Sequence, residues 1–200
     1  MKSNKMKLIL IISLELFCQL LLAQSNYRQM RPFNVELTKE NFVRVDNLWL
    51  WQENNLEKEM FFLNYCFNYI SQNSFLKIDS TEYSPYKSEI FAYKSKVFND
   101  KILIWVTEYE FTSNIHLLYI KDNKITNIGR LPVQNTCREC DDRIYPIKKI
   151  RITETESNIK FSFLQPAIVN GDEKDSTDNN SKDLNFIFDK STYKLIKHWR

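Results

Sequence analysis

Residues 90–131, IFAYKSKVFNDKILIWVTEYEFTSNIHLLYIKDNKITNIGRL, decide the fold of this chain. Runs rich in Ile, Val, Leu, Phe and Tyr alternate here with Asn/Asp pairs, which tolerate left-handed backbone and form tight turns. Asn99-Asp100 separates the first two runs, and Asp122-Asn123 separates the last two. The pattern predicts four antiparallel strands, at residues 90–98, 102–109, 115–120 and 125–131.

The C-terminal part continues the same rhythm. Turn pairs at Glu156-Ser157 and Asp189-Lys190 separate further β-type runs, so two more hairpins are expected. Their strands are predicted at 145–153 with 159–168, and at 184–188 with 193–198. Together the eight strands predict an antiparallel meander that forms a curved sheet or a partial barrel.

One segment before the meander has a different period. Apolar side chains recur there at spacings of three and four, which is typical of an amphipathic helix. They are Leu56, Met60, Leu63, Phe67 and Ile70. We therefore expect a helix over residues 53–72, preceded by an extended apolar stretch at 42–51. The predicted fold class is α+β, mostly β, with this helix packed on the meander.

The first 23 residues have the pattern of a cleavable signal peptide. Three lysines precede an apolar run that ends at Ala23, and the polar Gln24 follows. The alternative is a membrane anchor, but a spanning helix needs about 20 mainly apolar residues, and Glu15 and Gln19 interrupt this run. We expect an exported protein, periplasmic or extracellular, without stable membrane insertion after cleavage. The expected organisation is a signal peptide at 1–23, a flexible lead-in at 24–41 and a single β-rich domain at 42–200.

Composition excludes several classes of function. The net charge is +3, and loss of the signal peptide with its lysines lowers it further, so nothing drives binding to nucleic acid. Average usage would give about 14 glycines, whereas this chain has 2. Glycine-rich phosphate loops therefore cannot be assembled, and no cofactor is expected. The partner is expected to be a small molecule or a protein.

Glu108, Glu110 and His116 are the candidate catalytic residues. The glutamates share a strand face about 7 Å apart, a separation found in inverting glycosidases. A three-residue loop would place His116 opposite Glu110, and a two-residue turn would place it opposite Tyr109. Two glutamates on one face are also common where the end of a strand faces solvent. We therefore prefer a non-enzymatic protein and keep a hydrolase as the alternative hypothesis.

Tryptophan marks the candidate binding residues. Aromatic residues make up 14% of the chain, and exposed aromatic rings can stack on sugars or anchor a protein partner. Trp49 and Trp51 lie where the lead-in joins the core, and they are the candidates. Trp105 has the apolar neighbours Leu103 and Val106, so it is expected in the core.

Cys137 and Cys140 form a C-x-x-C pattern, and in an exported protein we expect them to form a local disulfide. A redox pair is the alternative, but Asp141 and Asp142 follow at once and should raise rather than lower a thiol pKa. A zinc site would need Cys66 and His116 as further ligands, and neither brings a second closely spaced pair. The acidic tract at 170–183 lacks the EF-hand calcium pattern, so no metal is expected.

Overall fold

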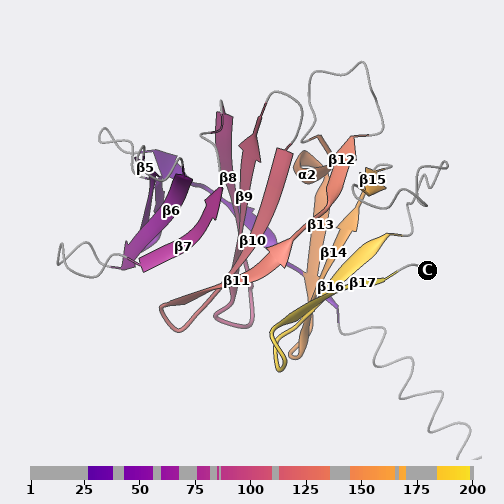
Figure 1. Cartoon of the computed structure of the whole chain (residues 1–200). Helices are drawn as coiled ribbons and strands as arrows, with labels where there is room; N and C mark the ends of the chain where they lie inside the picture. Colours follow the sequence, from indigo (N-terminus) through magenta and orange to yellow (C-terminus); the bar gives the residue numbers. More distant parts are fainter. Residues whose placement is uncertain are drawn as a thin grey trace, which may run out of the picture.

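The computed structural model describes residues 27–37, 43–55, 60–67, 76–81, 85, 87–109, 113–135, 145–164, 167–169 and 184–198. Within them the chain is all-β, with three five-stranded antiparallel sheets and a two-stranded ribbon. We name the three larger sheets A, B and C, and their strands are given in the next paragraph. Sheet B lies between sheets A and C, so the fold has three layers (Figure 1). No helix of the described residues is long and apolar enough to cross a membrane.

The strands of each sheet lie side by side, and sheets A and B draw them from distant parts of the chain. Sheet A has the spatial order β1 (Arg28–Gln29), β13 (Ile150–Glu154), β14 (Asn158–Phe163), β16 (Asn185–Asp189) and β17 (Lys194–His198). Sheet B has the order β11 (Lys124–Arg130), β10 (Ser113–Lys121), β9 (Lys101–Glu108), β8 (Lys87–Lys94) and β2 (Arg31–Phe33). Sheet C has the order β3 (Glu36–Leu37), β4 (Val43–Val45), β5 (Leu48–Asn55), β6 (Met60–Phe67) and β7 (Leu76–Thr81). The ribbon is β12 (Val133–Asn135) with β15 (Ala167–Val169), and α2 (Tyr145–Lys148) is a single helical turn.

The composition of β9 explains why sheet B is the middle layer. Its apolar run is continuous, and a strand that is apolar on both faces needs cover on both faces. Ile102 and Ile104 belong to the core between sheets A and B. Leu103 and Trp105, on the opposite face, belong to the core between sheets B and C.

The helix predicted at residues 53–72 is wrong, and with it the α+β class. β5 and β6 form an antiparallel hairpin here, with Leu50 opposite Tyr65. Leu63 and Phe67 lie four residues apart, and such positions share a face in a strand as well as in a helix, so they do not distinguish the two. The aromatic content of MFFLNYCF, residues 60–67, favours a strand. The rest of the predicted helix lies outside the described residues.

Each strand predicted from residue 90 onward contains an observed strand, but they lie in two sheets and a ribbon rather than in one curved sheet or partial barrel. Two of the predicted strands end too late: β8 ends at Lys94, so residues 95–98 belong to a loop, and β14 ends at Phe163, with residues 167–169 in β15. The turn at Asp122-Asn123 has φ values of 49° and 57°, so these residues do adopt the left-handed conformation. Residue 145 begins α2 instead of a strand, and β13 starts at Ile150.

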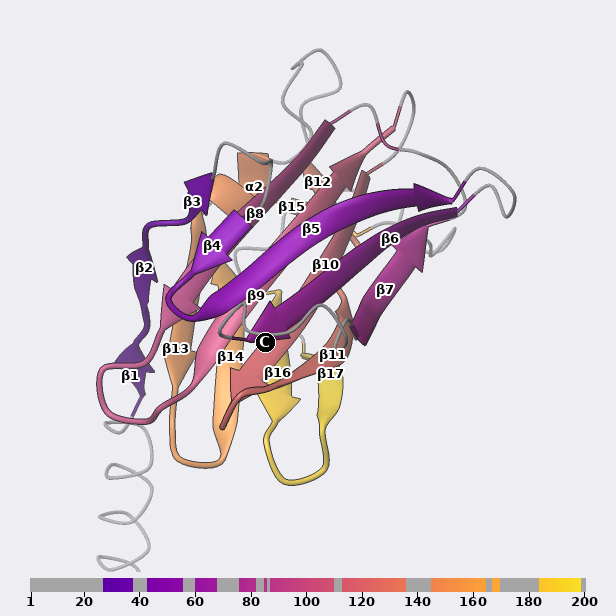
Figure 2. The same cartoon turned by 90° about the vertical axis from the view of Figure 1, so that its left-hand side faces the viewer.

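The segment expected to be a flexible lead-in contains the edge strands of all three sheets. β1 pairs with β13 in sheet A, β2 pairs with β8 in sheet B, and β3 pairs with β4 in sheet C. Figure 2 shows these three short strands following one another along one side of the molecule. Between β1 and β2, Met30 is 1% exposed and lies in the core between sheets A and B. We call residues 27–37 the N-terminal strap.

Candidate functional site

A pocket of about 590 Å³ lies where the strap meets the turns of sheets A and B. Small-molecule sites in proteins usually measure roughly 300 to 1,000 Å³. Three segments line it: the start of the strap, the β8–β9 loop and the β13–β14 turn. The lining residues are Tyr27, Arg28, Phe98, Thr155, Glu156, Ser157 and Asn158.

The β8–β9 loop brings Phe98 to the pocket through its own hydrogen bonds. The Ser95 hydroxyl oxygen accepts the backbone N–H of Val97 at 3.0 Å and that of Phe98 at 2.7 Å. The backbone N–H of Ser95 donates to the Asp100 carbonyl at 2.9 Å and closes the loop. Side-chain hydroxyls that bond the backbone nearby hold a turn in one conformation, so these bonds hold the backbone at Phe98 in place.

The β13–β14 turn is the tight hairpin expected at Glu156-Ser157. Thr155 N–H donates to the Asn158 carbonyl at 2.8 Å, and the Thr155 hydroxyl accepts the Asn158 N–H at 3.0 Å. Asn158 Nδ2 donates to Ser157 Oγ at 3.0 Å. These bonds orient the amide and the hydroxyl at one wall of the pocket.

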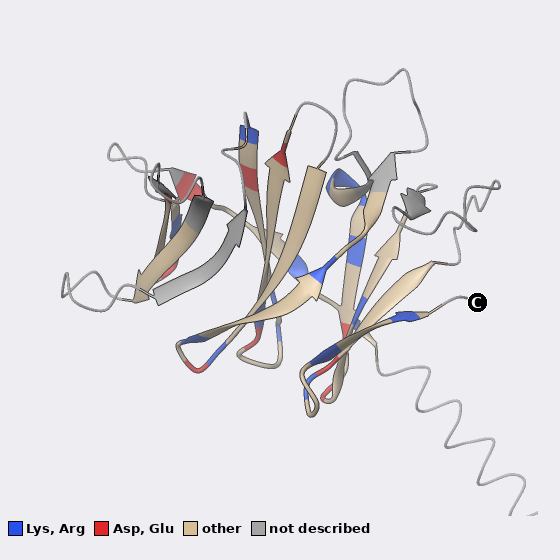
Figure 3. Cartoon of the chain, in the orientation of Figure 1, with Lys and Arg blue, Asp and Glu red and all other residues tan. Residues whose placement is uncertain are grey.

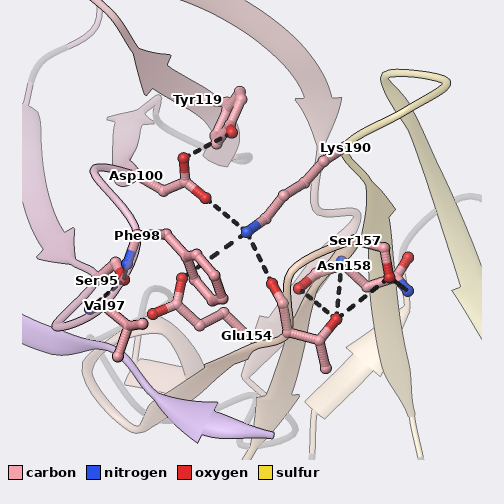
Figure 4. A network of polar contacts seen from close by, with 10 residues as sticks. Ser95, Val97, Phe98, Asp100, Tyr119, Glu154, Ser157, Asn158 and Lys190 are labelled. Atoms are coloured by element: carbon pink, nitrogen blue, oxygen red, sulfur yellow. Dashed lines mark hydrogen bonds and ion pairs between the residues drawn. The ribbon is translucent and has the colours of Figure 1, made fainter. Parts of the chain in front are cut away.

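A buried cluster of charged side chains closes the core between sheets A and B behind the pocket (Figure 4). Lys190 Nζ lies 2.5 Å from Asp100 Oδ2 and 3.9 Å from Glu154 Oε2. It also donates to the Thr155 carbonyl at 2.9 Å and lies 4.7 Å from the centroid of the Phe98 ring. Tyr119 donates its hydroxyl to Asp100 Oδ1 at 2.9 Å. Lys190 therefore connects Asp100 and Glu154 to the two pocket-lining segments that contain Thr155 and Phe98.

Glu154 is the unusual member of this cluster. It is 1% exposed, so its carboxyl group is almost completely removed from water. Burial raises the pKa of the Glu154 carboxyl above its ordinary value, and this effect exceeds the lowering by the Ser95 hydroxyl and the Lys190 ammonium. The raised pKa favours the neutral form of Glu154 beside the Lys190–Asp100 ion pair.

The charged residues of the described chain gather at the hairpin ends, whereas the strands of sheet B are uncharged along most of their length (Figure 3). At the pocket, the exposed Arg28 and Glu156 carry opposite charges. The Arg28 charge also acts on the buried Glu154 carboxyl, whose pKa it lowers. The pocket therefore offers both a cation and an anion to a ligand.

Glu108 and His116 do not come together. The hairpin register pairs His116 with Trp105 and Ser113 with Glu108, unlike either register considered from the sequence. Since Glu108 is three residues from Trp105, it lies on the opposite face of sheet B from His116. This register places apolar residues opposite one another, such as Val106 with Ile115. Glu110 lies outside the described residues.

His116 and Glu108 have partners suited to structural roles. The His116 side chain is fully buried, with its ring centroid 4.8 Å from that of Trp105. The Glu108 side chain is 8% exposed, and its Oε1 lies 3.7 Å from Lys87 Nζ. Neither residue lines the pocket.

Trp49 and Trp51 share the outward face of sheet C, because both alternate with the inward Leu48 and Leu50 of β5. They are partly exposed, and the Arg44 guanidinium lies 5.4 Å from the Trp49 ring centroid. Trp105 is fully buried, which confirms its expected place in the core.

The remaining predicted sites fall mostly outside the described residues. These include the signal peptide, Cys137, Cys140 and the acidic tract at 170–183. Cys66 is buried on β6 rather than in a helix. Within the part of the chain that the structure describes, no group of three or more His, Cys, Asp or Glu side chains could hold a metal ion.

Sequence reasoning missed the pocket and the cluster behind it. Their residues come from segments far apart in the chain, and none belongs to a motif. The available signal was weak: Phe98, Glu156 and Lys190 all lie in or beside turns that the sequence did predict.

Comparison with protein families, curated proteins and solved structures finds no match to this chain.

Proposed function

We propose that this protein is an exported, non-enzymatic binding module that holds a small polar molecule in the pocket at Tyr27, Phe98 and Asn158. The observation that carries the proposal is the pocket itself, whose volume of about 590 Å³ and mixed lining suit a small ligand. Phe98 supplies an apolar wall, while Arg28, Glu156 and Asn158 supply hydrogen-bonding groups. Such convergence of a few polar groups on an aromatic surface is typical of ligand sites.

The position of the pocket supports binding rather than catalysis. The sheets form a rigid base, and the pocket lies on turns that project from it, as binding sites commonly do. Lys190 and Asp100 are bonded to each other and buried, at 8% and 2% side-chain exposure, so they act as supports. Glu108 and His116 do not line this pocket, which makes a hydrolase at this site the weaker hypothesis.

A ligand screen tests the binding proposal. Ligand-observed NMR with a mixed set of small sugars, amino acids and carboxylic acids should find saturable binding to the purified protein. Arg28→Gln should weaken that binding about tenfold, which corresponds to about 1.4 kcal/mol and is typical of a lost charge-assisted hydrogen bond. Arg130→Gln, at an exposed arginine on β11 outside the pocket, is the matched control and should bind normally. Absence of any binder sensitive to Arg28→Gln would refute the proposed function.

The export half of the proposal rests on the sequence pattern at residues 1–23. We expect the mature protein to begin at Gln24, because the apolar run ends at Ala23. N-terminal sequencing of material recovered from outside the cytoplasm measures this directly. Protein that retains Met1 and sediments with membranes would contradict it.

A further inference from the structure

We propose that the ligand of this pocket is a neutral saccharide, bound with the face of one sugar ring against an aromatic side chain. The inference rests on the proposed function and specifies its ligand. A pyranose ring is uncharged, has C–H groups on its faces and carries hydroxyls around its edge. The pocket offers a counterpart to each of these features.

The aromatic side chains provide the surface for stacking. Phe98 lines the pocket and is held by the Ser95 hydroxyl and by Lys190, whose ammonium lies 4.7 Å from the ring centroid. Tyr27 lines the pocket from the strap, and Lys160 Nζ lies 5.9 Å from its ring centroid. A ring that is held by its neighbours before binding, as Phe98 is, loses little conformational entropy when a ligand binds.

The polar wall can bond hydroxyls, which both donate and accept. The Asn158 Nδ2 group is already used by Ser157 Oγ, so the amide is oriented and its Oδ1 can accept a hydrogen bond. Glu156 adds two acceptor oxygens, and the Arg28 guanidinium adds up to five donors. The pocket lining therefore includes both donors and acceptors, which suits the hydroxyls of a sugar ring.

The charge balance selects against ligands with a net charge. A carboxylate or phosphate ligand would be attracted by Arg28 and repelled by Glu156, and a cationic ligand would meet the reverse. Behind the pocket, Lys190 and Asp100 cancel, and the raised pKa of Glu154 favours its neutral form. An uncharged ligand avoids all of these penalties.

The test is titration of the purified protein with methyl glycosides of glucose, galactose and N-acetylglucosamine and with their disaccharides, followed by ligand-observed NMR and calorimetry. At least one of these probes should bind saturably, with the strongest saturation transfer at ring C–H protons. Tyr27→Ala should weaken binding about tenfold, and Tyr27→Phe should retain it because the ring remains. Ile196→Ala, at an exposed apolar residue of β17 outside the pocket, is the control.

Two results would overturn the saccharide assignment. One is saturable binding of amino acids or carboxylic acids, sensitive to Arg28→Gln, while every glycoside fails to bind; this result leaves the proposed binding function standing. The other is glycoside binding that Tyr27→Ala leaves unchanged, which would place the sugar elsewhere on the molecule. Failure of all compounds in the wider screen would instead refute the binding function itself.

Discussion

Lys190→Met should lower the free energy of unfolding by about 3 to 5 kcal/mol, the usual loss when one partner of a buried ion pair is removed. The Lys190 side chain is 8% exposed, and it lies 2.5 Å from Asp100 and 3.9 Å from Glu154. Methionine keeps most of the side-chain volume but leaves the carboxyl groups without an ammonium. Urea denaturation at neutral pH measures the loss.

The same variant should have a distinctive dependence on pH. The pKa of Glu154 is raised in the folded protein, so the folded state binds this proton more tightly than the unfolded state. Its contribution to stability is complete below about pH 4.5, the ordinary pKa of the group, and is lost as pH rises through the folded-state value. Without Lys190, the charged form of Glu154 is disfavoured further. The loss of unfolding free energy in Lys190→Met should therefore shrink as the pH falls, because Glu154 then becomes protonated.

Two controls separate charge from packing in this experiment. Lys194→Met removes an exposed lysine of the neighbouring strand and should change stability by no more than about 0.5 kcal/mol. Adding Glu154→Gln to Lys190→Met should recover part of the loss, because it removes one buried carboxylate. A deficit that is the same from pH 4 to pH 8 would mean that buried charge is not its cause.

Trp105→Ala should cost about 3 to 5 kcal/mol, since it removes a large, fully buried side chain from the middle sheet. The indole packs in the core between sheets B and C, and its Nε1 donates to Ser88 Oγ at 2.8 Å. Gln52 Nε2 donates to the same hydroxyl oxygen at 2.6 Å and links β5 of sheet C to sheet B. The substitution therefore opens a cavity and weakens the polar link between two layers. Equilibrium denaturation measures the change.

Trp49→Ala is the matched control, because Trp49 is partly exposed on the outward face of sheet C. It should cost clearly less than Trp105→Ala. If the two substitutions cost the same, or if Trp105→Ala costs under about 1 kcal/mol, sheet C does not cover sheet B in solution. The comparison therefore tests the three-layer arrangement as well as one residue.

The strands from residue 87 onward could be predicted because their turns have local signals, such as the Asp122-Asn123 pair. The helix predicted at 53–72 failed because Leu63 and Phe67 fit both periods, and the strand preference of the aromatic residues 60–67 was given too little weight against the spacing. Layering could have been suspected from the continuous apolar run of β9. The short strands of the strap could not, because two or three residues carry no period at all.

The candidate site was harder to predict than the fold. Trp49, Trp51 and Glu108 were chosen for their side-chain chemistry, but the pocket depends on which turns lie side by side. Arg28 pairs with Glu154 across β1 and β13, and no local pattern in the sequence joins them. Turn residues such as Glu156 look like ordinary solvated positions until the neighbouring Phe98 and Tyr27 are in place.

The N-terminal strap also determines the order in which the edge strands of the three sheets can pair during synthesis. Its partners lie progressively later in the sequence toward the N-terminus: Glu36 pairs with Arg44, Arg31 with Lys94 and Arg28 with Glu154. Closing longer loops costs more entropy, and distant contacts form more slowly. We therefore expect the start of the strap to pair last, although it is synthesised before its partner strands, with the edge of sheet C closed before that of sheet A. Since Tyr27 and Arg28 line the pocket, we expect the pocket to be completed only in the final step of folding.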